Sequence, residues 1–295
     1  MKKAWIKLHT AVLLAGATGL FGRLVSLQEI PLVWYRVIFS TIIVACALGI
    51  GKKMEKVPAG HAVMISLSGM LLALHWVLFY ASIRASNVSI GVLCCALIGV
   101  YTAILDPFVN HKKFSWKDIL FSMITLTGLL FIYSFDSRYR TGIIIGAISS
   151  LVAAFFSMTT KKLTRICDYS SNTLLLYEMI GGFVLLTLFM PFFSALNPGT
   201  SLVPDMKDLF WLLILAGLCT VVQYFFQFES LKAVSTFTVT LTYNLEPIYS
   251  IIFAMVLFGE AHELNFSFYI GLALIISSVL LQNLSVFRHK KLFQA

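Results

Sequence analysis

YASIRASNVS, residues 80–89, recurs in altered form 148 residues later as FESLKAVSTF, residues 228–237. Both stretches place an aromatic residue, a serine, an aliphatic residue, a basic residue and an alanine in the same order. Just upstream of each, the pair His75-Trp76 aligns with Gln223-Tyr224. This similarity between distant parts of the chain indicates that the protein consists of two related halves.

The composition predicts that both halves lie in a membrane. Of 295 residues, 59% are hydrophobic and 12% are charged, and the mean hydropathy is +0.90, whereas a soluble domain has about 25% charged residues. Apolar runs of about 18 residues recur along the whole chain, which is typical of membrane-spanning helices. We expect ten such helices, at about residues 8–27, 32–50, 61–82, 87–109, 117–134, 142–161, 172–193, 208–229, 234–258 and 266–285.

A second alignment divides these helices into two sets of five. LVWYR (32–36) aligns with LLLYE (174–178) at an offset of 142 residues. The predicted repeats are residues 1–135 and 141–287. Because five is an odd number, the second repeat enters the membrane in the opposite orientation to the first. The predicted fold is therefore an all-α polytopic membrane protein with two inverted five-helix repeats, an architecture typical of transporters.

The distribution of basic residues predicts the orientation in the membrane. With the N-terminus inside, sixteen of the 22 Lys and Arg residues fall on the cytoplasmic side and five fall outside. This asymmetry follows the positive-inside rule, so both termini are expected in the cytoplasm. The same placement accounts for the net charge of +9 without a nucleic-acid partner.

Two long segments resemble a known family. HWVLFYASIRASNVSIG (75–91) and ESLKAVSTFTVTLTYNLEPIYSIIFAMVLFGE (229–260) are similar to the EamA family of the drug/metabolite transporter superfamily. The resemblance implies ten helices around a central cavity and the export of metabolites or amino acids. The first half departs from the pattern, with Gly99 in place of Pro247 and Lys112 near the position that matches Glu260.

Two charged residues at equivalent positions of the repeats are candidate pathway residues. Arg36 lies roughly 6–8 Å below the outer boundary of its helix, and Glu178 lies roughly 8–9 Å from the inner boundary of its own. Their expected separation of about 13–15 Å along the membrane normal argues against a direct salt bridge. We expect each to face a water-filled cavity near one gate. The alternative is that each side chain reaches the nearest membrane interface.

Glu246 has no such alternative, because about twelve residues of helix, or ~18 Å, separate it from the membrane surface. Pro247 removes a backbone donor beside it, and Gly99 occupies the matching place in the first half. Helix-breaking residues at corresponding positions of two repeats predict the binding centre. The alternative is a structural kink with Glu246 hydrogen-bonded internally.

Aromatic and polar side chains complete the predicted lining of the cavity. Amphipathic rings suit a small organic solute that has both polar and apolar parts. Ordinary helix packing and internal hydrogen bonds are the alternative roles for the same residues. The predicted lining is His75, Trp76, Tyr80, Tyr101, Gln223, Tyr224, Tyr243 and Asn244.

The predicted function is secondary active transport of a small metabolite by alternating access, as an amino-acid-type exporter in a bacterial inner membrane. Protons are the candidate coupling ion, and the sequence leaves the substrate and the oligomeric state open. No cofactor, metal site or catalytic residue is expected, because ALGIGKK (47–53) lacks the first Gly and the Ser/Thr of a phosphate-binding loop and hydrolase motifs are absent. A channel and an intramembrane enzyme remain as alternatives, the enzyme because His75 and Glu246 can share one cavity.

Overall fold

A computed structural model describes residues 2–109, 115–231, 239, 242–243 and 245–292. These described residues form helices joined by short turns, without a strand among them. The longer helices of the first part of the chain are α1 (Lys2–Gly16), α2 (Thr18–Leu24), α3 (Glu29–Ile50), α4 (Ala59–Ala85), α5 (Val88–Cys94), α6 (Leu97–Val109) and α7 (Trp116–Phe135). The remainder are α8 (Arg140–Ile166), α9 (Ser171–Leu196), α10 (Met206–Ala216), α11 (Gln223–Leu231), α13 (Glu246–Phe258) and α14 (Phe266–Leu292), with short helical turns η1 (Ser137–Tyr139), η2 (Gly217–Val222) and η3 (Glu260–His262).

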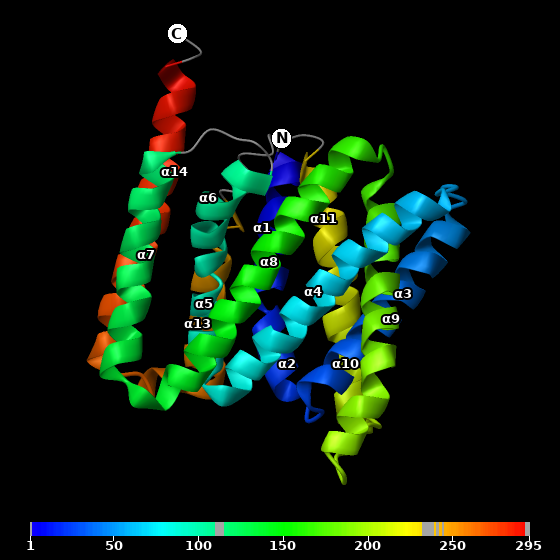
Figure 1. The fold of residues 1–295 in the computed structure, drawn as a ribbon, viewed down its shortest axis with the longest axis horizontal. Helices are drawn as coiled ribbons and strands as arrows, with labels where there is room; N and C mark the ends of the chain where they lie inside the picture. The colour runs from blue at the N-terminus through cyan, green and yellow to red at the C-terminus, as the bar shows by residue number, and fades with distance from the viewer. Residues whose placement is uncertain (1, 110–114, 232–238, 240–241, 244, 293–295) are drawn as a thin grey trace.

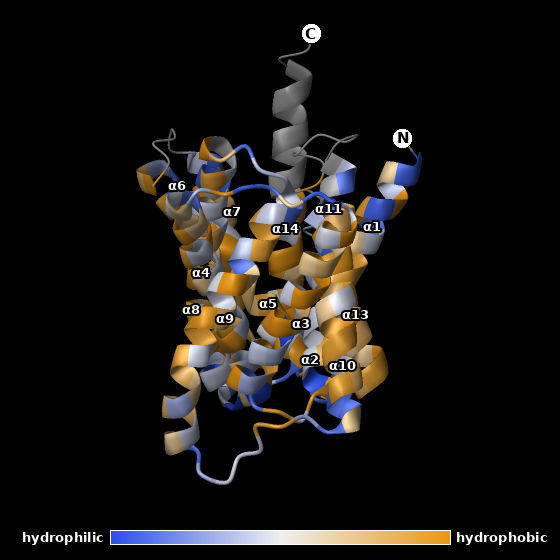
Figure 2. Cartoon of the chain, turned by 90° about the vertical axis from the view of Figure 1, so that its right-hand side faces the viewer, coloured by the Kyte–Doolittle hydropathy of each residue, from blue (hydrophilic) through white to orange (hydrophobic). Residues whose placement is uncertain are grey.

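The helices form a multi-pass membrane protein. Seven helical segments of the described chain are long and apolar enough to cross a membrane, and three further apolar helices, Ile119–Phe135, Glu246–Phe258 and Phe266–Leu281, are shorter. Figure 2 shows apolar residues around the middle of the molecule and hydrophilic residues gathered at its two ends. This distribution is the one expected for helices whose middle parts lie in lipid.

Successive segments run between the two ends of the molecule (Figure 1). α1 begins and α14 ends at the same end, which we call the terminal end. The turns η1 and η3 and the loop between α2 and α3 lie at the opposite end, which we call the far end. α1 begins at the terminal end, whereas α8 begins at the far end.

Two glycines allow α4 and α9 to pack with their backbones in contact. A Cβ atom on Gly69 would overlap the backbone of Glu178, and one on Gly181 would overlap the backbone of Ser66. The Ser66 hydroxyl also donates a hydrogen bond to the carbonyl of Tyr177 at 3.1 Å. Small residues at such crossings are typical of helix pairs in membranes. The contact fixes the depth of Glu178 relative to α4.

We expect Gly69→Ala to destabilise the protein by forcing α4 and α9 apart. Overpacking of this kind lowers the free energy of unfolding by about 1–3 kcal/mol, which thermal unfolding in detergent measures as a lower Tm. Gly60→Ala, in the same helix, is the matched control, because a Cβ there meets no atom within 4 Å. Equal Tm values for the two variants would contradict the close crossing.

α7 and α14 form a pair at the edge of the molecule (Figure 1). Gly128 and Gly271 face one another, so that a Cβ on either would meet the other's carbonyl oxygen, at 2.7 Å and 2.6 Å. The Thr125 hydroxyl donates to Ser278 Oγ at 2.9 Å. The pair stands apart from the charged residues described below, which lie on other helices.

The helix expected at 87–109 is interrupted at Cys95 and Ala96, between α5 and α6, so the break precedes Gly99 rather than falling on it. Of the helix expected at 234–258, much of the first part lies outside the described residues. Its later part, α13, begins at Glu246 with Pro247 in its first turn, where proline is tolerated because that N–H has no helical partner. α5 and α13 pack side by side.

Two buried carboxylates hold the far end together. Asp208, in the first turn of α10, accepts hydrogen bonds from the backbone N–H and hydroxyl of Ser26 at 2.7 and 2.6 Å. Glu260 accepts from the backbone N–H groups of Val88 and Ser89 at 2.9 and 2.8 Å. Glu260 thereby caps the N-terminus of α5, where a negative charge is favourable. Both carboxylates belong to the second half and bond to the first.

Asp136 makes a similar connection beside η1. It accepts hydrogen bonds from Arg138 at 2.8 and 3.0 Å and from the side-chain amide of Asn265 at 2.8 Å. The hydrogen bonds from Arg138 lower the pKa of Asp136, because they favour the charged form of the carboxyl group. The loop between α7 and α8 is thereby tied to the turn that precedes α14.

Candidate functional site

Arg36 lies in the middle of the protein rather than at its surface. Its side chain is buried, with 2% of the residue exposed. Nε donates to Thr220 Oγ1 at 3.0 Å, one terminal nitrogen donates to the hydroxyl of Tyr80 at 2.9 Å, and the other approaches the carbonyl of Cys219 at 3.4 Å. These contacts exclude the alternative that Arg36 reaches out to the membrane interface.

The guanidinium group of Arg36 has neutral partners only. Among the described residues, no Asp or Glu oxygen lies within ion-pair distance of it. Its central carbon lies 3.7 Å from the centre of the Trp76 ring, in a cation–π contact that is strengthened by the removal of water. A guanidinium has five N–H donors, and three hydrogen bonds account for only part of them. The remaining donors can bind an anionic group.

The partners of Arg36 on the opposite helix come from a π-helical turn. η2 connects α10 to α11, and the Thr220 hydroxyl donates to the carbonyl of Leu215, five residues earlier, at 3.1 Å. Such π-turns within α-helices frequently occur at functional sites. Thr220 and Cys219 were not predicted from the sequence, because no pattern in an apolar run distinguishes a π-turn from an ordinary helical turn.

Glu178 lies in α9 and is 4% exposed. The Thr160 hydroxyl lies 3.0 Å from its carboxylate, and Thr160 is in turn 2.9 Å from the Ser68 hydroxyl. Glu178 and Arg36 do not bond to each other in the structure, and each has partners on different helices. Thr160 and Ser68 were also missed, because isolated hydroxyl residues in apolar helices carry no sequence signal of their own.

His75 connects α4 to α8. Its Nδ1 lies 2.8 Å from the Ser149 hydroxyl oxygen, which donates to the carbonyl of His75 at 2.9 Å. Its ring also lies 6.0 Å from that of Phe79, between ring centres. These bonds to Ser149 match the alternative role of internal hydrogen bonding, whereas the next residue, Trp76, contacts Arg36.

Gln223 connects α11 to Tyr243. The Gln223 side-chain amide donates to the Tyr243 hydroxyl at 2.6 Å, and only 5% of Gln223 is exposed. Asn244, the next predicted residue, lies outside the described residues. Tyr101 lies elsewhere, in an apolar cluster with Leu97, Leu129 and Ile132 that does not include Trp76.

Tyr224 lies in α11 and packs against the apolar cluster that contains Trp76 and Tyr80. Tyr243, the hydrogen-bond partner of Gln223, packs against a separate cluster formed by Leu8, Val12 and Val239. The charged candidates Arg36, Glu178 and Glu246 lie on α3, α9 and α13.

Glu246 is the first residue of α13 and is partly exposed. Within the described part of the chain, no hydrogen bond or ion pair to its carboxylate is present. The N-terminus of a helix carries a partial positive charge that favours a carboxylate there. A carboxylate at this place can meet a cationic group or a proton.

The described residues do not form a cluster of metal-binding side chains. No group of three or more His, Cys, Asp or Glu side chains among them is arranged to hold a metal ion. Arg36 supplies a buried cation, and Glu178 and Glu246 supply carboxylates; such polar groups can recognise a small solute.

Comparison with known proteins gives three related findings. A family model described as the EamA-like transporter family matches residues 3–134 and 140–284. A Bacillus subtilis (strain 168) protein named "Uncharacterized transporter YxxF" is 23% identical over 273 residues, covering 88% of this chain and 84% of that protein. A protein of known crystal structure superposes with a TM-score of 0.63 at 14% sequence identity, covering 95% of this chain and 96% of that one. This last likeness concerns the fold alone.

Proposed function

Because the chain belongs to the EamA-like transporter family, we propose that it is a secondary active transporter that exports small metabolites of the amino-acid type. The family assignment weighs against catalysis by this chain. The transport mechanism is alternating access, in which two halves move around a central site. The site of action is the inner (plasma) membrane of a bacterium.

The observation that carries this proposal is the buried guanidinium of Arg36, which has no ion-pair partner among the described residues. Charged groups within membrane helices are unfavourable and mark pathways for solutes and ions. A carboxylate is the natural partner, since it accepts charge-assisted hydrogen bonds from a guanidinium. Glu246 supplies a carboxylate at the start of α13. A solute with both a carboxylate and an amine matches this pair of charges.

The architecture that we propose is ten membrane-spanning helices in two inverted repeats, with both termini in the cytoplasm. Three shorter apolar helices add to the seven long ones. The opposite starting ends of α1 and α8 support the inversion (Figure 1). The two separate matches of the family model support a boundary between residues 134 and 140.

Solute counterflow in proteoliposomes tests the proposed function. A screen of amino acids, nucleosides and drugs first identifies a solute that the protein moves. We then expect saturable counterflow, in which an unlabelled internal solute drives a transient accumulation of the labelled one. A channel would give no such overshoot, and an enzyme would convert the solute into a product.

We expect single cysteines placed near Lys53, Lys113 and Lys162 to be protected from an impermeant thiol reagent added outside intact cells. A cysteine near Arg138 should react, because the positive-inside rule places that loop outside. The measurement is mass-tagging of the thiol before and after cell lysis. Labelling near Lys113 from outside would contradict the inverted ten-helix architecture while leaving the family assignment unchanged.

A further inference from the structure

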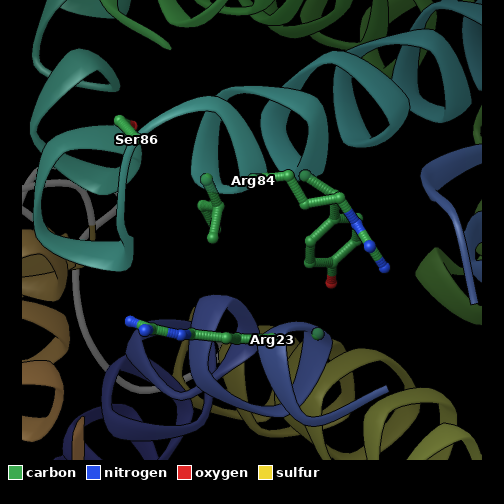
Figure 3. Close-up of a pocket in the computed structure, with 6 residues that line it drawn as sticks. Arg23, Arg84 and Ser86 are labelled. Carbon is green, nitrogen blue, oxygen red and sulfur yellow. The ribbon is translucent and has the colours of Figure 1, made fainter. Parts of the chain in front are cut away.

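A cavity of about 330 Å³ lies between α2 and α4 at the far end. Figure 3 shows Arg23 on α2 along one side of it, and Arg84 on α4 and Ser86, the residue that follows α4, along the other. Gly22, Tyr80 and Ile83 complete the lining. Arg84 also borders a neighbouring cavity of about 500 Å³, whose lining includes Asp205 and Asp208.

The charge of these arginines is only partly balanced. Arg23 forms an ion pair with Glu260, but the Glu260 carboxylate is shared with two backbone N–H groups of α5. Arg84 donates to the backbone carbonyls of Val25 and Leu27, which are neutral. The lining of the smaller cavity includes two arginines and no carboxylate, and a cleft lined by one sign of charge attracts ions of the other sign.

Tyr80 separates this cavity from Arg36. Its ring lines the cavity, and its hydroxyl accepts the hydrogen bond from Arg36 at 2.9 Å. The α2 backbone lies directly against the ring, because a Cβ on Gly22 would overlap the aromatic carbons of Tyr80. A displacement of this one ring would join the cavity to the donors of Arg36.

We propose that the cavity is an outer subsite for the carboxylate group of a small solute, and that Tyr80 is the positioning residue between this subsite and Arg36. The identity of the solute rests on the proposed transport function. The charge of the cavity does not depend on the transport function, and it can be measured without a known substrate. Arg84 holds the carboxylate at the outer position and Arg36 holds it at the inner one.

The first experiment measures the charge of the cavity with Ser86→Cys, in a protein whose native cysteines are replaced by alanine and which is reconstituted in phosphatidylcholine vesicles. The rates of reaction with a sulfonate-bearing and a trimethylammonium-bearing methanethiosulfonate are each divided by the rate with a free small thiol. We expect the anionic reagent to be favoured roughly tenfold, as for field-focusing clefts. Equal normalised rates would overturn the proposal.

Matched variants test whether Arg84 causes the preference of the introduced thiol for the anionic reagent. We expect Arg84→Gln to reduce this preference several-fold and Arg84→Lys to retain it, since lysine keeps the charge. Arg140→Gln is the control: Arg140 also donates to two backbone carbonyls, of Tyr133 and Ser134, but lines neither cavity. A preference that is unchanged by Arg84→Gln, or that falls equally with Arg140→Gln, would overturn the assignment.

Protection of the introduced thiol identifies the ligand. We expect alanine to slow the anionic reagent and alanine methyl ester, which lacks the carboxylate, to have no effect. Protection by added phosphatidylglycerol but not by alanine or glutamate would overturn the solute assignment in favour of a lipid headgroup. Protection by alanine without counterflow in the same vesicles would leave the subsite intact and reject the transport function.

Discussion

Arg36→Gln is expected to reduce transport of carboxylate-bearing solutes by roughly 30-fold or more, because removing one partner of a buried, hydrogen-bonded charge pair costs about 2–5 kcal/mol. Glutamine keeps hydrogen-bonding capacity but loses the positive charge. Arg36→Lys keeps the charge and should retain more activity, although lysine cannot form the two-pronged contact of a guanidinium. The measurement is counterflow of the solute identified in the screen, at matched protein levels.

The stability of the same variant separates a binding role from a structural one. A buried charge without a counter-ion is unfavourable in the folded protein, so Arg36→Gln should leave the Tm equal or higher while transport falls. Thr220→Val is the matched control, because it removes one neutral partner of Arg36 and preserves the charge; a smaller loss is expected. Near-normal transport by both Arg36 variants, or a large drop in Tm with Arg36→Gln, would contradict the binding role.

The site was only partly predictable from the sequence, and Arg36 illustrates why. A charge within an apolar run is conspicuous, since membranes disfavour it, and this singled out Arg36 and Glu178. The partners of these residues are ordinary in sequence: Thr220, Cys219 and Thr160 resemble any small residue of an apolar helix. Their roles depend on a π-turn and on helix crossings, which pattern and composition do not encode.

Changes within the predicted helices were likewise only partly predictable from the sequence. Pro247 pointed to a change in its helix, and α13 begins beside it at Glu246. The helix break predicted at Gly99 lies instead at Cys95 and Ala96, because a glycine permits a break without requiring one. The anchoring of α5 by Glu260 joins segments that are 171 or more residues apart, a distance over which no local pattern extends.

Glu246 presents a choice between two roles that the surrounding residues allow. Its carboxylate sits at the start of α13, next to Pro247. An ionised Glu246 can bind the amine of a solute. A Glu246 that takes up and releases a proton can couple solute movement to a pH gradient, and a change of charge at the end of a helix alters the balance with its dipole.

We expect Glu246→Gln to abolish accumulation driven by a pH gradient and to preserve solute exchange, because a neutral amide resembles the protonated acid. The measurement compares both activities in the same proteoliposomes, with Glu178→Gln as the matched control, since Glu178 already has a hydroxyl partner in Thr160. If exchange and accumulation fall together, Glu246 binds the solute amine instead. If neither changes, Glu246 is structural, and the central site must be sought away from α13, nearer to Arg36 and the π-turn.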